Sequence, residues 1–225
     1  MEEKKFVKKL YSKRFESDIE FRKQMWKVLC NNFFQKYVPI DSITLDVGAG
    51  YCEFINNIQS REKIALDINP DVKKFKSKNV AAVISPATNM ISINDKSVDV
   101  VFVSNFFEHL TKEQICATLK EIHRVLRNNG KVLLLQPNIR YCYKEYWMFF
   151  DHITPLDDRS LSEVLRVHNF HIEKCMPKFL PFSTKSSLPN SIFLLKIYLR
   201  FPFLQKIFGK QVFIVARKRV YGGKT

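Results

Sequence analysis

A short apolar run that ends in two closely spaced glycines constrains the fold of this chain more than any other feature. Residues 43–47 favour a strand, the turn Gly48-Ala49-Gly50 follows, and a helical pattern continues to Ile58. Glycines let the backbone turn sharply off a strand and let a ligand approach the main chain where a Cβ would collide. The sequence therefore predicts a nucleotide-like ligand at the carboxyl end of the first strand.

Acidic residues around this turn narrow the choice of ligand. A pyrophosphate-binding turn needs a third glycine, and that position is Glu53 here, whose carboxylate would repel a pyrophosphate. Glu53 is best explained as a first-turn acid favoured by the helix dipole, whereas Asp46 either caps the turn or faces the ligand. Asp67 ends the second strand nineteen positions after Gly48, where folds of this kind place the acid that binds ribose hydroxyls. We expect Asp67 to bind a ligand.

Strands and helical patterns alternate along the rest of the chain. Further strands are expected at residues 63–67, 80–84, 98–103, 131–136, 171–174 and 212–217, and helices at 18–38, 111–126 and 159–168. The run 98–103 is continuously apolar, as in a central parallel strand that is buried on both faces. This alternation predicts a doubly wound α/β sheet.

The charge of the chain is unevenly distributed. The formal net charge is +15, with +5 on residues 1–40, −1 on 41–173 and +11 on 174–225, the last stretch having no acidic residue. A basic tail fits a nucleic-acid binder, an enzyme whose substrate carries phosphate, or a protein that rests on an anionic membrane. Charge alone does not choose among these three classes.

The cysteines and the first residues of the sequence indicate the cellular compartment of the protein. The five cysteines are scattered and never form a CxxC pair, which argues against both a disulfide framework and a zinc site, so no metal is expected. Residues 1–13 are lysine-rich and lack the apolar run of a secretory signal. We expect a cytoplasmic protein with reduced thiols.

Four segments, taken in chain order, carry a resemblance to a known family. They are Leu45 to Gly50, the strand end Ala65-Leu66-Asp67, the stretch Val98 to Asn105 with Glu108-His109-Leu110, and His123-Arg124-Val125-Leu126 before Gly130. Together they resemble the successive motifs of class I S-adenosylmethionine-dependent methyltransferases over about residues 40–138. The resemblance implies a Rossmann-like, doubly wound sheet of seven strands with the last strand antiparallel, helices on both faces and a cap on the acceptor side.

The same resemblance implies a domain organisation and a cofactor site. Residues 1–40 would form an N-terminal helical cap, and 41–225 the methyltransferase domain with cap insertions at about 139–158 and 176–210. The implied cofactor residues are Asp46, Gly48, Ala49, Gly50, Asp67, Ile68, Ser85, Ala87, Ser104 and Asn105. S-adenosylmethionine has no phosphate and carries positive charge, so an acidic turn suits it. Where many relatives have an acid that reaches the adenine amine, this chain has Ser85-Pro86-Ala87-Thr88, which leaves the adenine contacts open.

Two histidines are candidates for catalysis. Methyl transfer needs a nucleophile held close and aligned, and a base helps when the acceptor is a hydroxyl or a protonated amine. His109 follows the loop after the fourth strand, and His152 stands next to Asp151. The catalytic candidates are therefore His109, His152 and Asp151, and the alternative is that both histidines are hydrogen-bonded loop residues.

Segments outside the core resemble a narrower subgroup. Residues 137–141, 151–152, 155–161 and 179–186, with Tyr11, Arg14 and Phe15, resemble methyltransferases of bacterial surface-polysaccharide biosynthesis. This resemblance implies an anionic sugar, nucleotide-linked sugar or glycan acceptor. Its implied acceptor-binding residues are Tyr11, Arg14, Arg140, Tyr141, Tyr146, Arg159 and Lys185. The aromatic residues could instead form the core of a lid, and an RNA methyltransferase is the alternative function, although no recognisable RNA-binding module is seen.

The basic tail contains an apolar stretch at Ser191 to Phe208 that Pro202 interrupts. It is too short and too charged for a membrane span, which needs about 20 mostly apolar residues. It is either an amphipathic helix on an anionic leaflet or a cap helix whose cations face a phosphorylated acceptor. We favour the cap helix, because its place between the last two strands ties both ends to the sheet.

Overall fold

The computed structural model of the chain describes residues 19–182 and 191–219. Three of the predicted acceptor residues, Tyr11, Arg14 and Lys185, lie outside the described residues, as does Phe15. The remaining predicted site residues can be placed.

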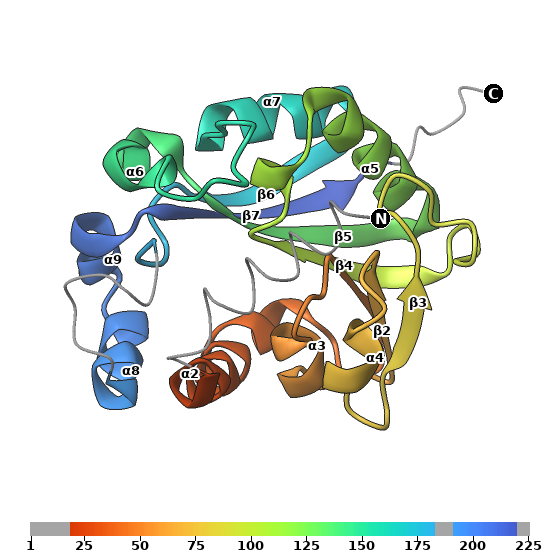
Figure 1. Ribbon diagram of the computed structural model, residues 1–225, viewed down its shortest axis with the longest axis horizontal. Helices are drawn as coiled ribbons and strands as arrows, with labels where there is room; N and C mark the ends of the chain where they lie inside the picture. The colour runs from red at the N-terminus through yellow and green to blue at the C-terminus, as the bar shows by residue number, and fades with distance from the viewer. Residues whose placement is uncertain (1–18, 183–190, 220–225) are drawn as a thin grey trace.

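A seven-stranded sheet forms the centre of the molecule (Figure 1), in the order β3-β2-β1-β4-β5-β7-β6. The strands are β1 Ile43–Val47, β2 Glu62–Asp67, β3 Ala81–Ile84, β4 Val98–Ser104, β5 Leu126–Pro137, β6 Phe170–Met176 and β7 Gln211–Lys218. Strands β1 to β5 pair in parallel, and β7 pairs antiparallel with both β5 and β6. The predicted Rossmann-like sheet, with its last strand antiparallel, is confirmed.

Helices cover both faces of this sheet (Figure 1), with α5, α6 and α7 on one side and α2, α3, α4 and α8 on the other. Their bounds are α2 Ile19–Asn32, α3 Glu53–Asn57, α4 Val72–Phe75, α5 Lys112–Val125, α6 Ile139–Tyr146, α7 Asp158–Val167, α8 Ile192–Arg200 and α9 Pro202–Phe208, with short 3₁₀ turns η1 Phe34–Tyr37 and η2 Phe107–His109. None of the helices in the described ranges is both long and apolar enough to cross a membrane.

The boundary between α5 and β5 differs from the sequence-based expectation. The helix begins as predicted, with Thr111 and Gln114 forming a reciprocal capping box. It ends at Val125, one residue from the predicted end. Strand β5 was expected to begin at residue 131, after the turn residues Asn128-Asn129-Gly130, but Leu126 already pairs with Val98. The turn residues become a local irregularity within the strand because tertiary pairing overrides their turn propensity.

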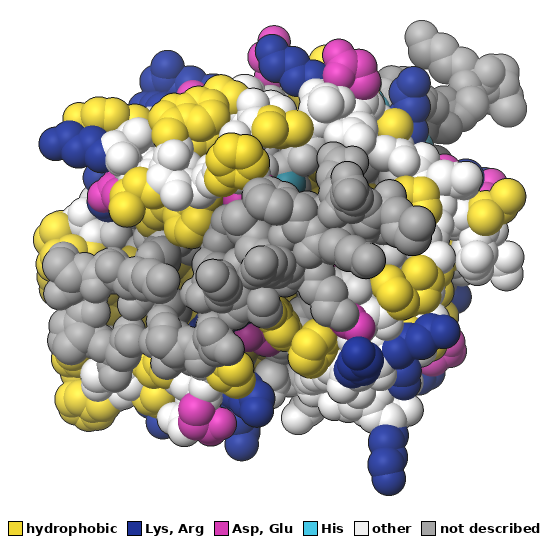
Figure 2. Space-filling view, viewed as in Figure 1, with side chains coloured by type: hydrophobic (Ala, Val, Ile, Leu, Met, Phe, Trp, Pro, Cys, Tyr) yellow, Lys and Arg dark blue, Asp and Glu magenta, His cyan; other side chains and the backbone are white. Residues whose placement is uncertain are grey.

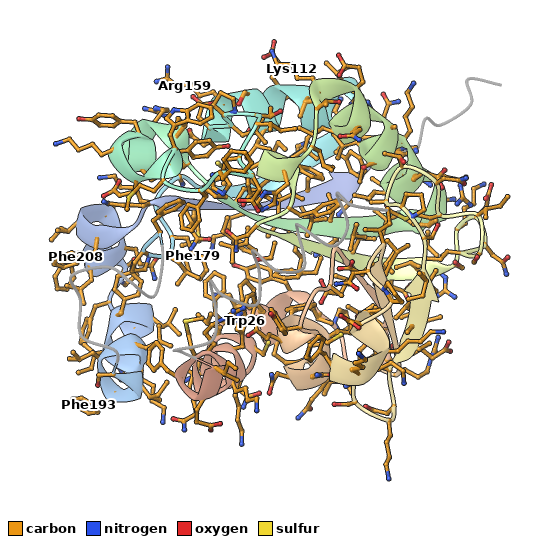
Figure 3. All side chains as sticks on the ribbon, viewed as in Figure 1. Trp26, Lys112, Arg159, Phe179, Phe193 and Phe208 are labelled. Atoms are coloured by element: carbon orange, nitrogen blue, oxygen red, sulfur yellow. The ribbon has the colours of Figure 1, made fainter. Side chains whose placement is uncertain are left out.

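Each face of the sheet has its own apolar core. Alternate residues of β4 point to opposite faces, so Val101 belongs to the core beneath α5 and α7 and Phe102 to the core beneath α2 and α3. The second core is aromatic. The Phe54 and Phe102 rings stack with 3.7 Å between their centres, and the Phe179 ring stacks on Phe33 with 4.0 Å between their centres. Figure 3 shows Phe179 and Trp26 between the sheet and the helices. Stacked and edge-to-face rings contribute about 0.5–1.5 kcal/mol per pair beyond their buried area.

Segments far apart in the sequence meet where β5 ends and β7 begins. Pro137 pairs with Gln211, so the chain after β5 and the chain before β7 lie at one edge of the sheet. The backbone amide of Asn138 donates to the carbonyl of Lys210, and the Lys210 ammonium lies 2.5 Å from the Glu145 carboxylate. Helices α6 and α9 are therefore anchored near the carboxyl end of β5, where the acceptor-side cap was predicted, whereas α8 packs against α2.

Candidate active site

The glycine turn after β1 has the conformation that its sequence predicts. Gly48 and Gly50 have φ of +70° and +49°, the left-handed region in which a side chain costs about 1–2 kcal/mol. The amides of Gly48 and Ala49 both donate to the carbonyl of Leu66, at 2.9 and 3.1 Å. The end of β2 thus fixes the turn.

The two glycines differ in what surrounds them. A Cβ on Gly48 would lie 2.6 Å from the Phe106 ring, so the loop after β4 packs directly on the turn. Among the residues that the structure describes, a Cβ on Gly50 would meet only the Gly48 carbonyl oxygen, 3.9 Å away. Gly48 is thus needed for packing within the protein, while the described residues leave open space beside the backbone of Gly50.

Asp67 sits at the end of β2, as predicted, and its carboxylate is held by the backbone. Its Oδ2 accepts the amide of Gly50 at 2.8 Å and its Oδ1 accepts the amide of Asn69 at 2.7 Å. Burial raises the pKa of this carboxyl, and the two backbone hydrogen bonds oppose that shift. Each carboxylate oxygen can accept a further hydrogen bond, so Asp67 can serve both the turn and a ribose.

Asp46 and Glu53 have different environments. Asp46 is buried in β1, and burial together with the nearby Asp67 charge raises its pKa to about 8. Glu53 begins α3, and one of its oxygens lies 2.6 Å from the Arg22 guanidinium. Glu53 therefore joins α2 to α3, in agreement with a structural role, whereas the raised pKa of Asp46 indicates a site that favours an added positive charge.

These features fit S-adenosylmethionine. A bare backbone at Gly50 permits close approach, Asp67 offers acceptors for hydroxyls, and the buried carboxyl of Asp46 would be stabilised in its charged form by a cationic group. When bound, that cofactor supplies a methyl group on a positively charged sulfur.

The other predicted cofactor residues occupy varied places. Ser104 and Asn105 end β4, with Asn105 exposed at φ +46° and its amide nitrogen 3.0 Å from the Ser104 hydroxyl. Ser85 donates to the carbonyl of Asn89 at 2.5 Å. Ala87 is part of the apolar core and Ile68 is half exposed. Ser104 and Asn105 thus lie at the strand-end edge, and Ala87 contributes to packing.

The three predicted catalytic residues come together. Nδ1 of His109 lies 2.9 Å from the carbonyl oxygen of Asp151 and 3.3 Å from its Oδ2, and the His109 and His152 rings are 5.1 Å apart. In the neutral ring, a proton on Nδ1 would be donated to these oxygens and would leave the lone pair on Nε2. A fourth residue joins them: Oε1 of Glu108 is 3.9 Å from Nε2 of His109.

Aromatic side chains surround His152. Its ring stacks on the Phe149 ring, with 5.0 Å between the ring centres. The centres of the Tyr146 and Phe182 rings lie 4.6 and 6.4 Å from that of His152. Tyr146 is fully buried and its hydroxyl donates to the carbonyl of Thr154 at 2.5 Å. Tyr146 therefore belongs to the interior of the lid, the alternative that the sequence left open, and does not face an acceptor across an open surface.

The remaining predicted acceptor residues lie on α6 and α7. Arg140 pairs with Asp158 at 2.8 Å, and the Lys178 ammonium lies 4.6 Å from the centre of the Tyr141 ring. Arg159 is exposed at the start of α7 and is visible at the outer surface in Figure 3. The structure thus groups Arg140 and Tyr141 near the cap and separates Arg159 from the histidine cluster by placing it on the outer surface.

Three residues of this region were given no role from the sequence. Glu108 was noted only as part of a motif. Gln136, fully buried, accepts the amide of Phe106 at 3.2 Å, and Asn138, also fully buried, donates to Asp158 at 2.8 Å and to the carbonyl of Pro177 at 3.0 Å. Their signal is the change from the apolar β5 run to Gln-Pro-Asn at the strand end, where buried polar residues mark connections between segments.

Comparison with known proteins finds similarity to methyltransferases. Residues 45–134 match the model of a family described as a methyltransferase domain. An uncharacterized methyltransferase-like protein of Schizosaccharomyces pombe is 29% identical over 170 residues, which are 72% of this chain and 58% of that protein. The chain spans about half the length of the curated relatives it matches.

Solved structures share the fold. A SAM-dependent methyltransferase from Archaeoglobus fulgidus has a TM-score of 0.68 at 23% identity, over 91% of this chain and 99% of that one. A geranyl diphosphate C-methyltransferase from Streptomyces coelicolor, solved with Mg²⁺, geranyl diphosphate and S-adenosyl-L-homocysteine, has a TM-score of 0.58 at 13% identity, over 84% of this chain and 80% of that one.

Proposed function

We propose that this chain, which carries a class I S-adenosylmethionine-dependent methyltransferase domain, methylates an oxygen of a small-molecule or glycan acceptor. The proposal depends chiefly on one observation: His109, Asp151 and His152 meet beside the end of β4. That edge of an open α/β sheet is where ligands bind.

Different residues of the site bind the cofactor and activate the acceptor. Asp46, the glycine turn and Asp67 hold the cofactor at the ends of β1 and β2. We assign His109 to activating the acceptor hydroxyl through Nε2, either by its own lone pair or through a group bound to it, with Asp151 fixing the orientation of the ring. Holding the two reactants in line can lower the barrier by about 7–11 kcal/mol, and a positioned group that activates the hydroxyl adds roughly 10²–10⁴ in rate.

The acceptor is proposed to be anionic. Residues 174–225 carry 11 Lys and Arg and no acid, and the end of the 176–210 insertion leads into β7 beside the carboxyl end of β5. The resemblance to bacterial surface-polysaccharide enzymes supports a sugar, a nucleotide-linked sugar or its phosphorylated substituent, in capsule or lipopolysaccharide biosynthesis. The cytoplasmic location remains a prediction from the sequence.

Methyl transfer to purified sugar nucleotides and cell extracts, read by mass, tests this function. We expect a gain of one methyl group on an anionic sugar, and a loss of about 10²–10⁴ in rate for His109→Ala. His168→Gln is the matched control, because His168 lies at the end of α7 with Nδ1 2.8 Å from the carbonyl of Val164. Methylation of RNA in place of sugars, with nanomolar RNA binding at physiological salt, would establish the alternative function.

A further inference from the structure

We propose that Glu108, His109 and His152 bind a divalent transition-metal ion, such as Zn²⁺, next to the acceptor. One ligand atom from each residue lies within 4.8 Å of the other two. Ligands at about 2.0–2.2 Å from a tetrahedral Zn²⁺ stand roughly 3.4 Å apart, so small side-chain shifts bring the three atoms to bonding distance. The sequence predicts no metal because that argument considered only cysteine pairs.

The hydrogen bond of His109 resembles those that orient metal-binding histidines. Metal-binding histidines usually donate their other ring N–H to a carbonyl or carboxylate, which fixes the tautomer and the ring orientation. Nδ1 of His109 is 2.9 Å from the Asp151 carbonyl oxygen and 3.3 Å from the Asp151 carboxylate. Nε2 therefore faces Glu108 with its lone pair, at 3.9 Å from Oε1.

The burial of Glu108 also favours a cation. Only 2% of this residue is exposed, and a buried carboxylate is costly unless charge or hydrogen bonds compensate it. A divalent ion between Glu108 and the two imidazoles would add to the stabilisation of this carboxylate.

The two ligand-bearing segments are joined before any metal binds. The Glu108 carbonyl accepts the amides of Ile153 and Thr154 at 2.9 and 3.2 Å, and the Thr154 hydroxyl donates to the carbonyl of Leu110 at 2.5 Å. These bonds hold the loop after β4 against the segment that bears His152. Preorganisation of this kind lowers the cost of assembling a site from distant residues.

The donor set indicates the class of metal and its chemistry. Two imidazoles and one carboxylate suit Zn²⁺ and related first-row ions better than Mg²⁺ or Ca²⁺, and three protein ligands leave a fourth position open. A hydroxyl bound at that position loses its proton to solvent water more easily. The acceptor oxygen then bonds to the methyl carbon as the carbon–sulfur bond breaks. This role rests on the proposed function, whereas metal binding itself does not.

Metal titration of chelator-stripped full-length protein, without cofactor or acceptor, tests the site. We expect one equivalent of Zn²⁺ by calorimetry and a Co²⁺ complex with tetrahedral visible absorption. His152→Ala and Glu108→Gln should each weaken binding more than about 100-fold, since even outer-shell changes cost 10–100-fold. His168→Gln should bind as the unaltered protein does. If Glu108→Gln does not fold, His109→Gln replaces it.

Several results would overturn the site. They are the absence of a Zn²⁺ equivalent, equal affinity in His152→Ala, and a sulfur-to-cobalt absorption band, which would assign the metal to cysteines. Methyl transfer that survives complete metal removal would refute the activating role and leave the proposed function intact. A protein that binds metal at this site but methylates no oxygen acceptor would refute the proposed function and leave the metal site intact.

Discussion

At the scale of single residues, the site separates groups that shape the protein from groups directed at a ligand. Gly48 has the Phe106 ring against it, whereas Gly50 borders open space. Asp67 holds backbone amides at the end of β2, and Asp46 is buried with a raised pKa. Substitutions at these positions should therefore affect stability and cofactor binding in different proportions.

Gly48→Ala and Gly50→Ala form a matched pair. Both place a side chain in the left-handed region, at about 1–2 kcal/mol, and Gly48→Ala adds about 1–3 kcal/mol because the Phe106 ring must move. We expect Gly48→Ala to lose more stability in denaturant unfolding. Gly50→Ala should bind S-adenosylhomocysteine about 5- to 150-fold more weakly, because its methyl group occupies the space of the ligand. Equal stability of the two variants would contradict this assignment.

Asp67→Ala should weaken S-adenosylhomocysteine binding by about 1–3 kcal/mol, since ribose hydroxyls would lose their acceptor. Calorimetry measures the change. Glu62→Ala is the control, because Glu62 is exposed at the opposite end of the same strand. Unchanged affinity in Asp67→Ala would show that the ribose binds elsewhere.

Cofactor affinity should depend on pH through Asp46. Its folded pKa of about 8 lies above its usual range, so near pH 7 the free protein holds a proton there that a cationic ligand displaces. Affinity should rise with pH, approaching about tenfold per unit below pH 8, and level off above it. The same raised pKa means that this group lowers the stability of the free protein as pH rises from about 4 to 8.

Calorimetry in buffers of different ionisation enthalpy should show proton release near pH 7. Asp46→Asn should abolish both the release and the pH dependence. A pH profile that Asp46→Asn shares with the unaltered protein would refute the assignment.

At the scale of elements, the sequence predicted the helix and strand boundaries that neighbouring residues determine. It did not predict the boundaries that long-range contacts determine. Strand β1 and the start of α5 follow from neighbouring residues, the second through the cap at Thr111. The predicted start of β5 was wrong because pairing of Leu126 with Val98 decides it. The candidate site divides in the same way. Asp67 follows from spacing within one βαβ unit, whereas the contact of His109 with Asp151 spans 42 positions and depends on the tertiary fold.

Asn138→Ala should loosen the cap. Asn138 begins α6 and bonds to Asp158 and to the carbonyl of Pro177, so one side chain joins the segments after β5, before α7 and after β6. We expect a loss of about 1–3 kcal/mol in stability, with faster hydrogen exchange in α6 and α9. In the unaltered protein, cofactor and acceptor together should slow exchange in these helices. Asn128→Ala, at an exposed position, is the control, and exchange in α6 and α9 that matches it would rule out this linking role.

At the scale of the whole molecule, exposed apolar side chains gather on one side. Hydrophobic side chains line the left edge of the surface in Figure 2, and Figure 3 places Phe193 and Phe208 there. Phe203 and Ile207 are 58% and 62% exposed, beside Lys206. On α8, Tyr198 is buried instead and donates to the carbonyl of Phe179. Part of this segment thus packs inward, and the rest offers an apolar, basic face to the outside.

We expect this face to bind anionic vesicles. Phosphatidylglycerol vesicles should carry the protein in flotation at low salt and release it at high salt, because charge contributes about 1 kcal/mol per Lys or Arg near the surface. Phe203→Ser with Ile207→Ser should abolish flotation. Ile91→Ser, at a residue 80% exposed on the loop before β4, should not. If the double variant still floats but its acceptor KM rises, the face serves the acceptor, as the sequence favoured.

The position of β7 imposes an order on biosynthesis. This strand, the last one described along the chain, lies between β5 and β6. While the ribosome is making the segment 177–210, which takes roughly 2–7 s at ordinary elongation rates, β5 has an open edge and β6 has no neighbour to join. The nascent chain must wait with unpaired strands exposed. Premature release in this interval would leave an aggregation-prone fragment, so the yield of native protein depends on the synthesis of β7.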